Sequence, residues 1–234
     1  MQKLPVIEVI QEALGIVWGK RFSLTQALMG YALFFTTLDT LVAYLGEDGP
    51  WLHFGLTLVY FVMLTLFAVT CHRIVLLDAH AVPRYGLMKW SSRETRFLGW
   101  TLGVYCVAGI LLLTFSSLSM LASESPASML LAMLPAAYVF SRLSVLLPAT
   151  ALDERHDMQW AWELTEGNGW RLTILTAVIP GLITVIESRL SSDHLPLNLI
   201  GNFFAYALLA IEIAMLSVSF RRLDEMRTVP AEAP

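Results

Sequence analysis

The chain has 234 residues, of which 56% are hydrophobic and only 15% are charged, and its mean hydropathy is +0.64. So few charged side chains cannot cover the surface of a water-soluble globule of this size, and a disordered chain would carry far fewer apolar residues. The net charge of −4 argues against a nucleic-acid partner, because phosphate binding needs Lys and Arg clustered on one accessible face. A multi-span membrane protein is the class that remains.

Six segments approach the roughly 20 apolar residues that a helix needs to cross a bilayer. They run from Leu24 to Leu45, Trp51 to Leu77, Phe97 to Leu121, Met129 to Leu147, Trp170 to Ile186 and Leu199 to Phe220. The fifth segment is short, and Pro180 and Gly181 interrupt it. The sequence therefore predicts an all-α integral membrane protein with six transmembrane helices, forming one membrane domain over residues 1–234.

The basic residues are strongly biased to one side of these spans. Of the 15 Lys and Arg residues, only Arg189 falls on the side of the first, third and fifth connections. Basic residues are retained on the cytoplasmic face of a membrane. Both termini are therefore predicted to be cytoplasmic, with residues 221–234 forming a tail.

An amphipathic segment precedes the first span. From Leu4 to Gly19, polar residues including Glu8, Gln11 and Glu12 recur on one helical face, and apolar residues occupy the other. This pattern predicts a helix within residues 1–21, lying either in the headgroup plane or against the protein's own spans. A second such segment begins at the predicted N-cap Asp157, and a less regular one follows Pro83.

The same arrangement recurs three times, with a period of about 75 residues. The predicted hairpins cover residues 22–77, 96–147 and 170–220. Each hairpin opens with one arginine (Arg21, Arg96, Arg171) and closes with another (Arg73, Arg142, Arg221). The sequence HRIVLL at 72–77 resembles SRLSVLL at 141–147, and these observations together predict three related hairpin repeats with amphipathic helices on the cytoplasmic side.

Two stretches resemble a known group of proteins. They are residues 139–149 (VFSRLSVLLPA) and 161–171 (AWELTEGNGWR). With the amphipathic segment ahead of each hairpin, they resemble the YciC-like bacterial inner-membrane proteins of unknown function and the membrane domain that accompanies some glycerophosphodiester phosphodiesterases. The resemblance implies a six-helix protein of the bacterial inner membrane. The phosphodiesterase domain that carries the catalytic residues has no counterpart here, so no catalytic residue is carried over.

Three ionisable residues are predicted to lie at membrane depth, where charges are costly and mark candidate functional sites. Asp39 lies near the outer end of the first span, with His53 or Arg189 as candidate partners. Glu212 and Arg142 lie roughly five to eight residues from the cytoplasmic ends of their spans, at a depth of about 10 Å. Their similar depth permits an ion pair, which would either pin two helices together or gate a pathway.

The three closing arginines, Arg73, Arg142 and Arg221, suggest a binding site. If the repeat is real, they converge at one depth on the cytoplasmic side, with the opening arginines nearby. Guanidinium groups at the headgroup level can hold phosphate bidentately, so the hypothesis is a site for an anionic phospholipid. The alternative is ordinary snorkelling of basic side chains, which needs no ligand.

Signals for catalysis are few. Cys71, His72, Asp78 and His80 crowd the end of the second span, but their spacing matches no metal-binding motif. Gly167-Asn168-Gly169 lacks the preceding strand and following Lys of a phosphate loop and predicts a turn. The sequence therefore predicts no catalytic, cofactor or metal residues.

The function predicted from these features is a non-catalytic one. The chain is expected to be a structural, lipid-interacting or partner-binding component of the bacterial envelope. Its expected partners are membrane lipids, including anionic phospholipid, and other membrane-protein subunits. The alternative is a small solute or proton-coupled transporter or channel that uses Asp39, Glu212 and Arg142.

Overall fold

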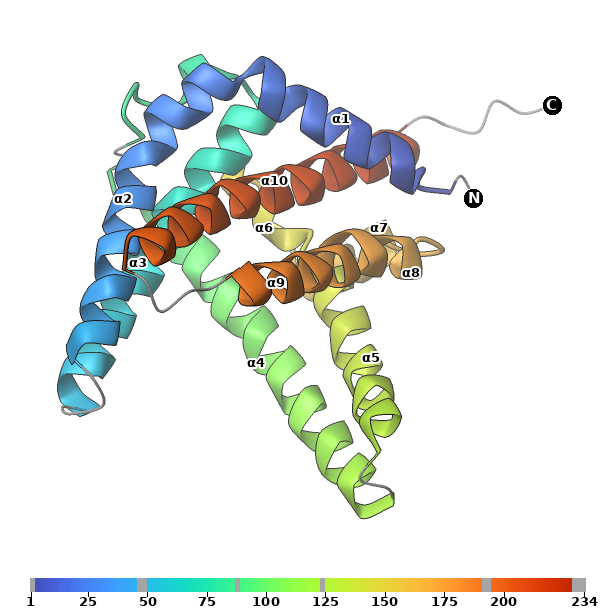
Figure 1. The fold of residues 1–234 in the computed structure, drawn as a ribbon. Coiled ribbons are helices and arrows are strands. Elements are labelled where there is room, and N and C mark those ends of the chain that lie inside the picture. The colour runs from blue at the N-terminus through green and yellow to red at the C-terminus, as the bar shows by residue number, and fades with distance from the viewer. Residues whose placement is uncertain (1–2, 46–49, 87–88, 123–124, 191–194, 229–234) are drawn as a thin grey trace.

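The computed structural model describes residues 3–45, 50–86, 89–122, 125–190 and 195–228. Every regular element within these ranges is a helix, which confirms the all-α prediction. The long helices form three hairpins (Figure 1). These are α2 (Arg21–Leu45) with α3 (Pro50–Leu76), α4 (Ser92–Ala122) with α5 (Pro126–Leu143), and the arm α8 (Gly169–Thr173), η2 (Ile174–Val178), α9 (Ile179–Leu190) with α10 (Leu195–Thr228).

Four shorter elements connect or flank the hairpins. They are α1 (Val6–Gly19), η1 (Ala79–Ala81), α6 (Leu146–Ala151) and α7 (Met158–Leu164). The segments α1 and α7 correspond to two of the predicted amphipathic helices, and the Asp157 side chain caps α7 by accepting from the Trp160 amide at 2.8 Å. Between Pro83 and the start of α4, the described residues form no helix.

Five segments among the described residues are long and apolar enough to cross a membrane. They are Trp51–Leu76, Ser92–Met120, Leu130–Ala151, Gly169–Ile186 and Ile200–Thr228. The predicted first span forms α2, a helix of 25 residues, but it is not among the five. Several polar residues, including Gln26 and Asp39, lower its hydropathy.

The buried core lies where the hairpins meet, at the end that carries Arg21, Arg73, Arg96, Arg142, Arg171 and Arg221. We call this the basic end. The hairpin of α4 and α5 extends away from it (Figure 1), and only 17% of the span in α4 is buried, against 50% for the span in α10. The far ends of the hairpins therefore expose apolar side chains, as a surface facing lipid would.

The short helix α6 lies at the centre of the basic end, where it packs against α3, α4 and α10. All but one of its six residues are buried. Pro148 explains why α6 is separate from α5, because a proline removes the amide that would bond to the carbonyl of Ser144 four residues earlier. The Ser144 carbonyl instead accepts from the Leu147 amide at 3.0 Å, which breaks the helix at Ser144 and Val145.

The fifth predicted span is a nearly continuous helix despite Pro180. The backbone over Ile174–Val178 adopts a π-helical turn between α8 and α9. A π turn changes which carbonyl each amide meets, and it allows a helix to continue past a residue without an amide hydrogen. The expected interruption is therefore a local change of helical pitch.

The N-terminal helix α1 packs alongside the C-terminal part of α10 (Figure 1). Its buried residues, Val9 and Ala13, are completely covered. Of the two arrangements that the sequence allows for this helix, packing against the protein's own spans is therefore present. A second apolar face remains exposed at Ile7, Leu14 and Trp18.

Gly86 fixes the chain between η1 and α4 against α2. Its φ is +67°, and a Cβ there would lie 2.0 Å from the carbonyl oxygen of Ala27. Its own carbonyl accepts hydrogen bonds from the hydroxyls of Tyr31 and Thr70. Only glycine permits this conformation and this approach, so Gly86 holds the connection against the first hairpin.

Candidate functional site

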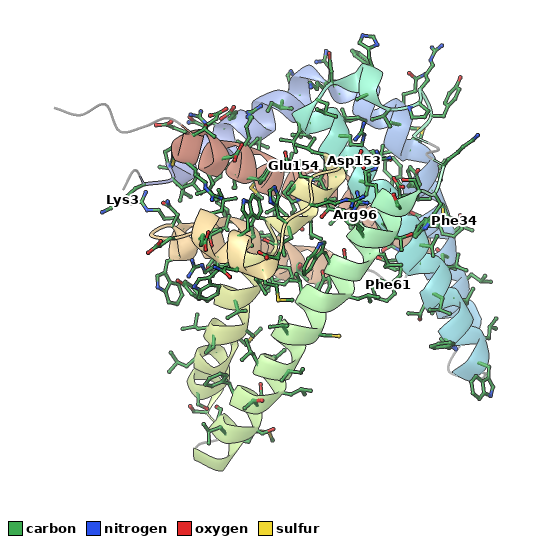
Figure 2. All side chains as sticks on the ribbon, turned by 180° about the vertical axis from the view of Figure 1, so that it is seen from behind. Lys3, Phe34, Phe61, Arg96, Asp153 and Glu154 are labelled. Atoms are coloured by element: carbon green, nitrogen blue, oxygen red, sulfur yellow. The ribbon has the colours of Figure 1, made fainter. Side chains whose placement is uncertain are left out.

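The residues with the most polar contacts lie at the basic end, around the carboxylate of Asp153. Asp153 follows α6, and Figure 2 shows it beside Arg96 of α4. The carboxylate lies 3.6 Å from Arg73, 3.0 Å from Arg93 and 3.4 Å from Arg96. Arg73 also donates to the carbonyl of Ala151 at 2.9 Å. One carboxylate therefore joins the end of α3 and the start of α4 to the end of α6.

The backbone of Asp153 is unusual, with a φ of 69°. The Glu154 amide donates to the Ala149 carbonyl and the Asp153 amide to the Thr150 carbonyl, both at 3.0 Å. This is the Schellman pattern that ends many helices, and its left-handed position is usually occupied by glycine. Aspartate adopts this conformation at a higher cost than glycine, and here its carboxylate contacts three arginines.

Glu94 is the second carboxylate of this cluster, and its residue is completely buried. It accepts from the Ser91 amide at 2.8 Å, which forms a capping box at the start of α4. It also pairs with Arg93 at 2.7 Å. Arg93 therefore bridges Glu94 and Asp153 and fixes the first turn of α4 against the end of α6.

Arg142 is buried between α5 and α7, with 6% of its surface exposed. Its guanidinium donates to the Thr165 hydroxyl at 2.8 Å and to the Trp162 carbonyl, and it lies 3.6 Å from the centroid of the Trp162 ring. The Tyr138 hydroxyl is 3.5 Å away. These contacts hold α7 against the end of the second hairpin, and they direct the guanidinium toward protein groups.

Arg221 joins α10 to α1. Arg221 and Arg222 both donate to the carboxylate of Glu12, and the Arg222 distances are 2.9 and 2.8 Å. Leu4 provides a further attachment, because its amide donates to the Asn168 side chain and its carbonyl accepts from Arg171, at 2.7 and 2.8 Å. The start of the chain is thus joined to both arms of the third hairpin.

The three closing arginines therefore share a location and a role. Each lies at the basic end, and each joins its hairpin to a shorter segment of the chain. Within the described residues, no hydrogen bond joins any two of them directly. Their hydrogen-bond partners are protein carbonyls, hydroxyls and carboxylates.

Asp39 lies in the first hairpin, away from the basic end. It accepts a hydrogen bond of 2.6 Å from the Tyr206 hydroxyl of α10. A cavity of about 320 Å³ opens beside it between α2 and α3. His53, Thr57 and Tyr60 are among the residues that line this cavity. His53, a candidate partner of Asp39 from the sequence, lines the same cavity, and the hydrogen-bond partner that the structure shows is Tyr206.

Glu212 is half-buried on α10 and interacts electrostatically with Tyr105 of α4. Arg142, with which the sequence allowed an ion pair, directs its guanidinium toward Trp162 of α7 and Thr165 at its end. Arg189, the other candidate partner of Asp39, has a side chain outside the part of the structure that is described.

The group of Cys, His and Asp residues near the end of α3 is dispersed among separate contacts. The Nδ1 atom of His72 lies 2.7 Å from the Ser217 hydroxyl, and the Cys71 thiol lies 3.6 Å from the Ala210 carbonyl. Asp78 forms an ion pair with Lys20 at 3.5 Å. His80 lines a different cavity, with Arg84. Across the described ranges, no three such side chains gather as metal ligands would.

Sequence reasoning missed Asp153, Glu94 and Glu12. Glu94 carried a local signal, because Ser91 and Glu94 have the spacing of a capping box. Asp153 and Glu12 had none, since their arginine partners lie at least 57 and 209 residues away in sequence. Their importance depends on the tertiary fold.

The chain matches no family model, no curated protein and no solved structure. The resemblance to the YciC-like proteins therefore rests only on the two sequence stretches and the amphipathic segments described above.

Proposed function

We propose that the protein is a non-catalytic component of the bacterial inner membrane that binds lipid and partner proteins. It crosses the membrane six times as three related hairpins, and both termini are cytoplasmic. The surfaces that would bind lipid and partner proteins are the apolar faces of the hairpins and the basic end where the hairpins meet.

One observation carries this proposal: the ionisable groups at the basic end are engaged in joining helices. Arg73, Arg142 and Arg221 donate to groups of the protein itself, and Asp153 receives three arginines. Groups held in this way are suited to a scaffold, because catalysis or transport needs polar groups that can change partner. The many exposed apolar side chains on the hairpins offer surface for lipid and for other membrane helices.

The test is to extract the protein from a bacterial membrane with a copolymer that keeps its surrounding lipid, and to identify by mass spectrometry everything that copurifies. We expect an anionic phospholipid enriched over its share of the bulk membrane, or a companion protein at constant ratio. A lipid composition equal to that of the bulk membrane, together with no companion protein, would refute the proposal.

The cavity beside Asp39 favours a second candidate function, proton-coupled transport. A carboxylate at membrane depth, bonded to a tyrosine and open to a cavity of about 320 Å³, is a group that can load and release a proton. Proton flux is measured in vesicles that contain the purified protein and an internal pH dye, under an imposed potential. The scaffold proposal expects the flux of protein-free vesicles. A flux above that level, lost in Asp39→Asn, would support transport instead.

A further inference from the structure

An apolar groove runs between α2 and α10, on the side of the first hairpin that faces the third. Its volume is about 260 Å³, and its polar surface is small. The walls are formed by Leu24, Thr25 and Met29 of α2 and by Phe203 and Ala207 of α10, and Phe67 of α3 lies at its base. Phe67 is 1% exposed, so the groove has a closed floor.

The length of the groove matches one leaflet of a bilayer. Along α2 it extends from Arg21 to Ala32, which is about 16 Å at 1.5 Å per residue. Half of a hydrocarbon core is about 15 Å thick. Tyr206 lies at the far end, where its ring stacks on Phe35 at 4.8 Å and its hydroxyl donates to Asp39. The groove therefore begins at the basic end and ends near the bilayer midplane.

The mouth of the groove carries one cation with exposed aromatic neighbours. The Arg21 guanidinium lies 5.0 Å from the Trp18 ring centroid and 4.7 Å from that of Phe22. Both rings are more than 70% exposed, as in the aromatic belt of a membrane protein. Arg21 donates one hydrogen bond to the Trp18 carbonyl at 2.8 Å. No carboxylate of the described residues forms an ion pair with it, in contrast to Arg73, Arg93, Arg96, Arg221 and Arg222.

We propose that this groove binds one anionic phospholipid, with an acyl chain between α2 and α10 and the phosphate on Arg21. The inference rests on the proposed lipid-interacting role and assigns that role to a specific place. An apolar channel of leaflet length accommodates a single chain, and a guanidinium at the headgroup level donates to phosphate oxygens. The arginines engaged inside the basic end position helices, whereas Arg21 faces the lipid at the mouth of the groove.

The experiment measures binding of phosphatidylglycerol and phosphatidylcholine to the detergent-purified full chain by native mass spectrometry. Arg21→Gln removes the cation and is expected to weaken phosphatidylglycerol binding about fivefold, with a smaller effect on phosphatidylcholine. Ala207→Trp fills the groove and is expected to weaken both lipids. Thr25→Trp fills it from the opposite wall and serves if Ala207→Trp does not fold, as judged by gel filtration and circular dichroism.

Two control variants lie outside the groove. Arg155→Gln removes another exposed arginine, and Leu113→Trp adds the same ring to an exposed position on α4. Equal losses in Arg21→Gln and Arg155→Gln, or unchanged binding in both groove-filling variants, would overturn the groove assignment. If wild-type protein binds lipid and the groove variants bind it equally well, only this inference fails. If wild-type protein binds neither lipid, the proposed lipid-interacting role fails with it.

Discussion

Arginine side chains make most of the polar connections between helices at the basic end. A guanidinium has five donors in a fixed plane, so one side chain can meet a carbonyl, a hydroxyl and an aromatic face together, as Arg142 does. Lysine has the same charge but lacks this planar arrangement. The sequence singled out Arg73, Arg142 and Arg221 because charge bias is a local signal. It did not predict their partners, because these come from distant parts of the chain.

Substitutions at Asp153 can separate the ionic and the backbone contributions of this residue to the stability of the protein. Asparagine tolerates the left-handed conformation as aspartate does, so Asp153→Asn removes only the charge. We expect a loss of about 1 kcal/mol, since half-exposed ion pairs contribute little individually. Asp153→Ala should be less stable than Asp153→Gly by about 1 kcal/mol, because only glycine adopts a φ of 69° without cost. Thermal unfolding in detergent gives this order.

Salt provides the control for Asp153. The difference in stability between wild type and Asp153→Asn should shrink at high ionic strength. The difference in stability between Asp153→Gly and Asp153→Ala should not change. Equal stability of the Gly and Ala variants would contradict the backbone argument. Equal stability of wild type and Asp153→Asn at low salt would show that the arginines contribute nothing through this carboxylate.

Among the elements, the long helices were predictable and the departures from regular helix were not. Apolar length alone indicates a span, so the bounds of α3, α4, α5 and α10 agree with the sequence to within eight residues, the largest difference being at the end of α10. Pro148 and Pro180 illustrate the limit. Both lie in apolar helical segments, yet one ends a helix and the other produces a π turn. Which outcome occurs depends on packing around α6 and α9.

The helix α1 has two apolar faces, one buried against the protein and one exposed, and the exposed face leads to a prediction. Val9 and Ala13 face the protein, while Ile7, Leu14 and Trp18 are exposed by 71, 46 and 73% at spacings that place them on one stripe. We expect this stripe to enter the membrane interface. A nitroxide on Cys introduced at each of the three positions, in a Cys71→Ala, Cys106→Ser background, should collide with oxygen more than with a water-soluble nickel complex.

Glu8 and Gly15 provide the matched controls, because both are exposed and lie seven residues apart on the polar side of the same helix. Labels in Glu8→Cys and Gly15→Cys should collide mainly with the nickel complex. If all five positions collide equally with nickel, α1 lies away from the membrane and only its contact with α10 positions it.

At the scale of the whole molecule, α2 decides how the chain is threaded. Its polar residues keep it out of the set of clearly apolar spans, yet it pairs with α3 along one hairpin and packs against α10. Asp39 is one of the residues that lower its hydropathy, but the hydrogen bond from Tyr206 offsets part of the cost of placing that carboxylate in a membrane. We therefore expect α2 to cross the bilayer as the other long helices do.

The two ends of the chain test this expectation, because an even number of spans places them in one compartment. Lys3→Cys and Thr228→Cys should both resist a membrane-impermeant maleimide in right-side-out vesicles and react in inverted ones, while Trp51→Cys and Ser125→Cys should do the reverse. If α2 lies on the surface instead, Lys3 and Thr228 fall on opposite sides, and a label on only one of them would show it. Five spans would also place α1 and the C-terminal part of α10 on opposite sides of the bilayer. That placement would break the contacts of the Glu12 carboxylate with Arg221 and Arg222.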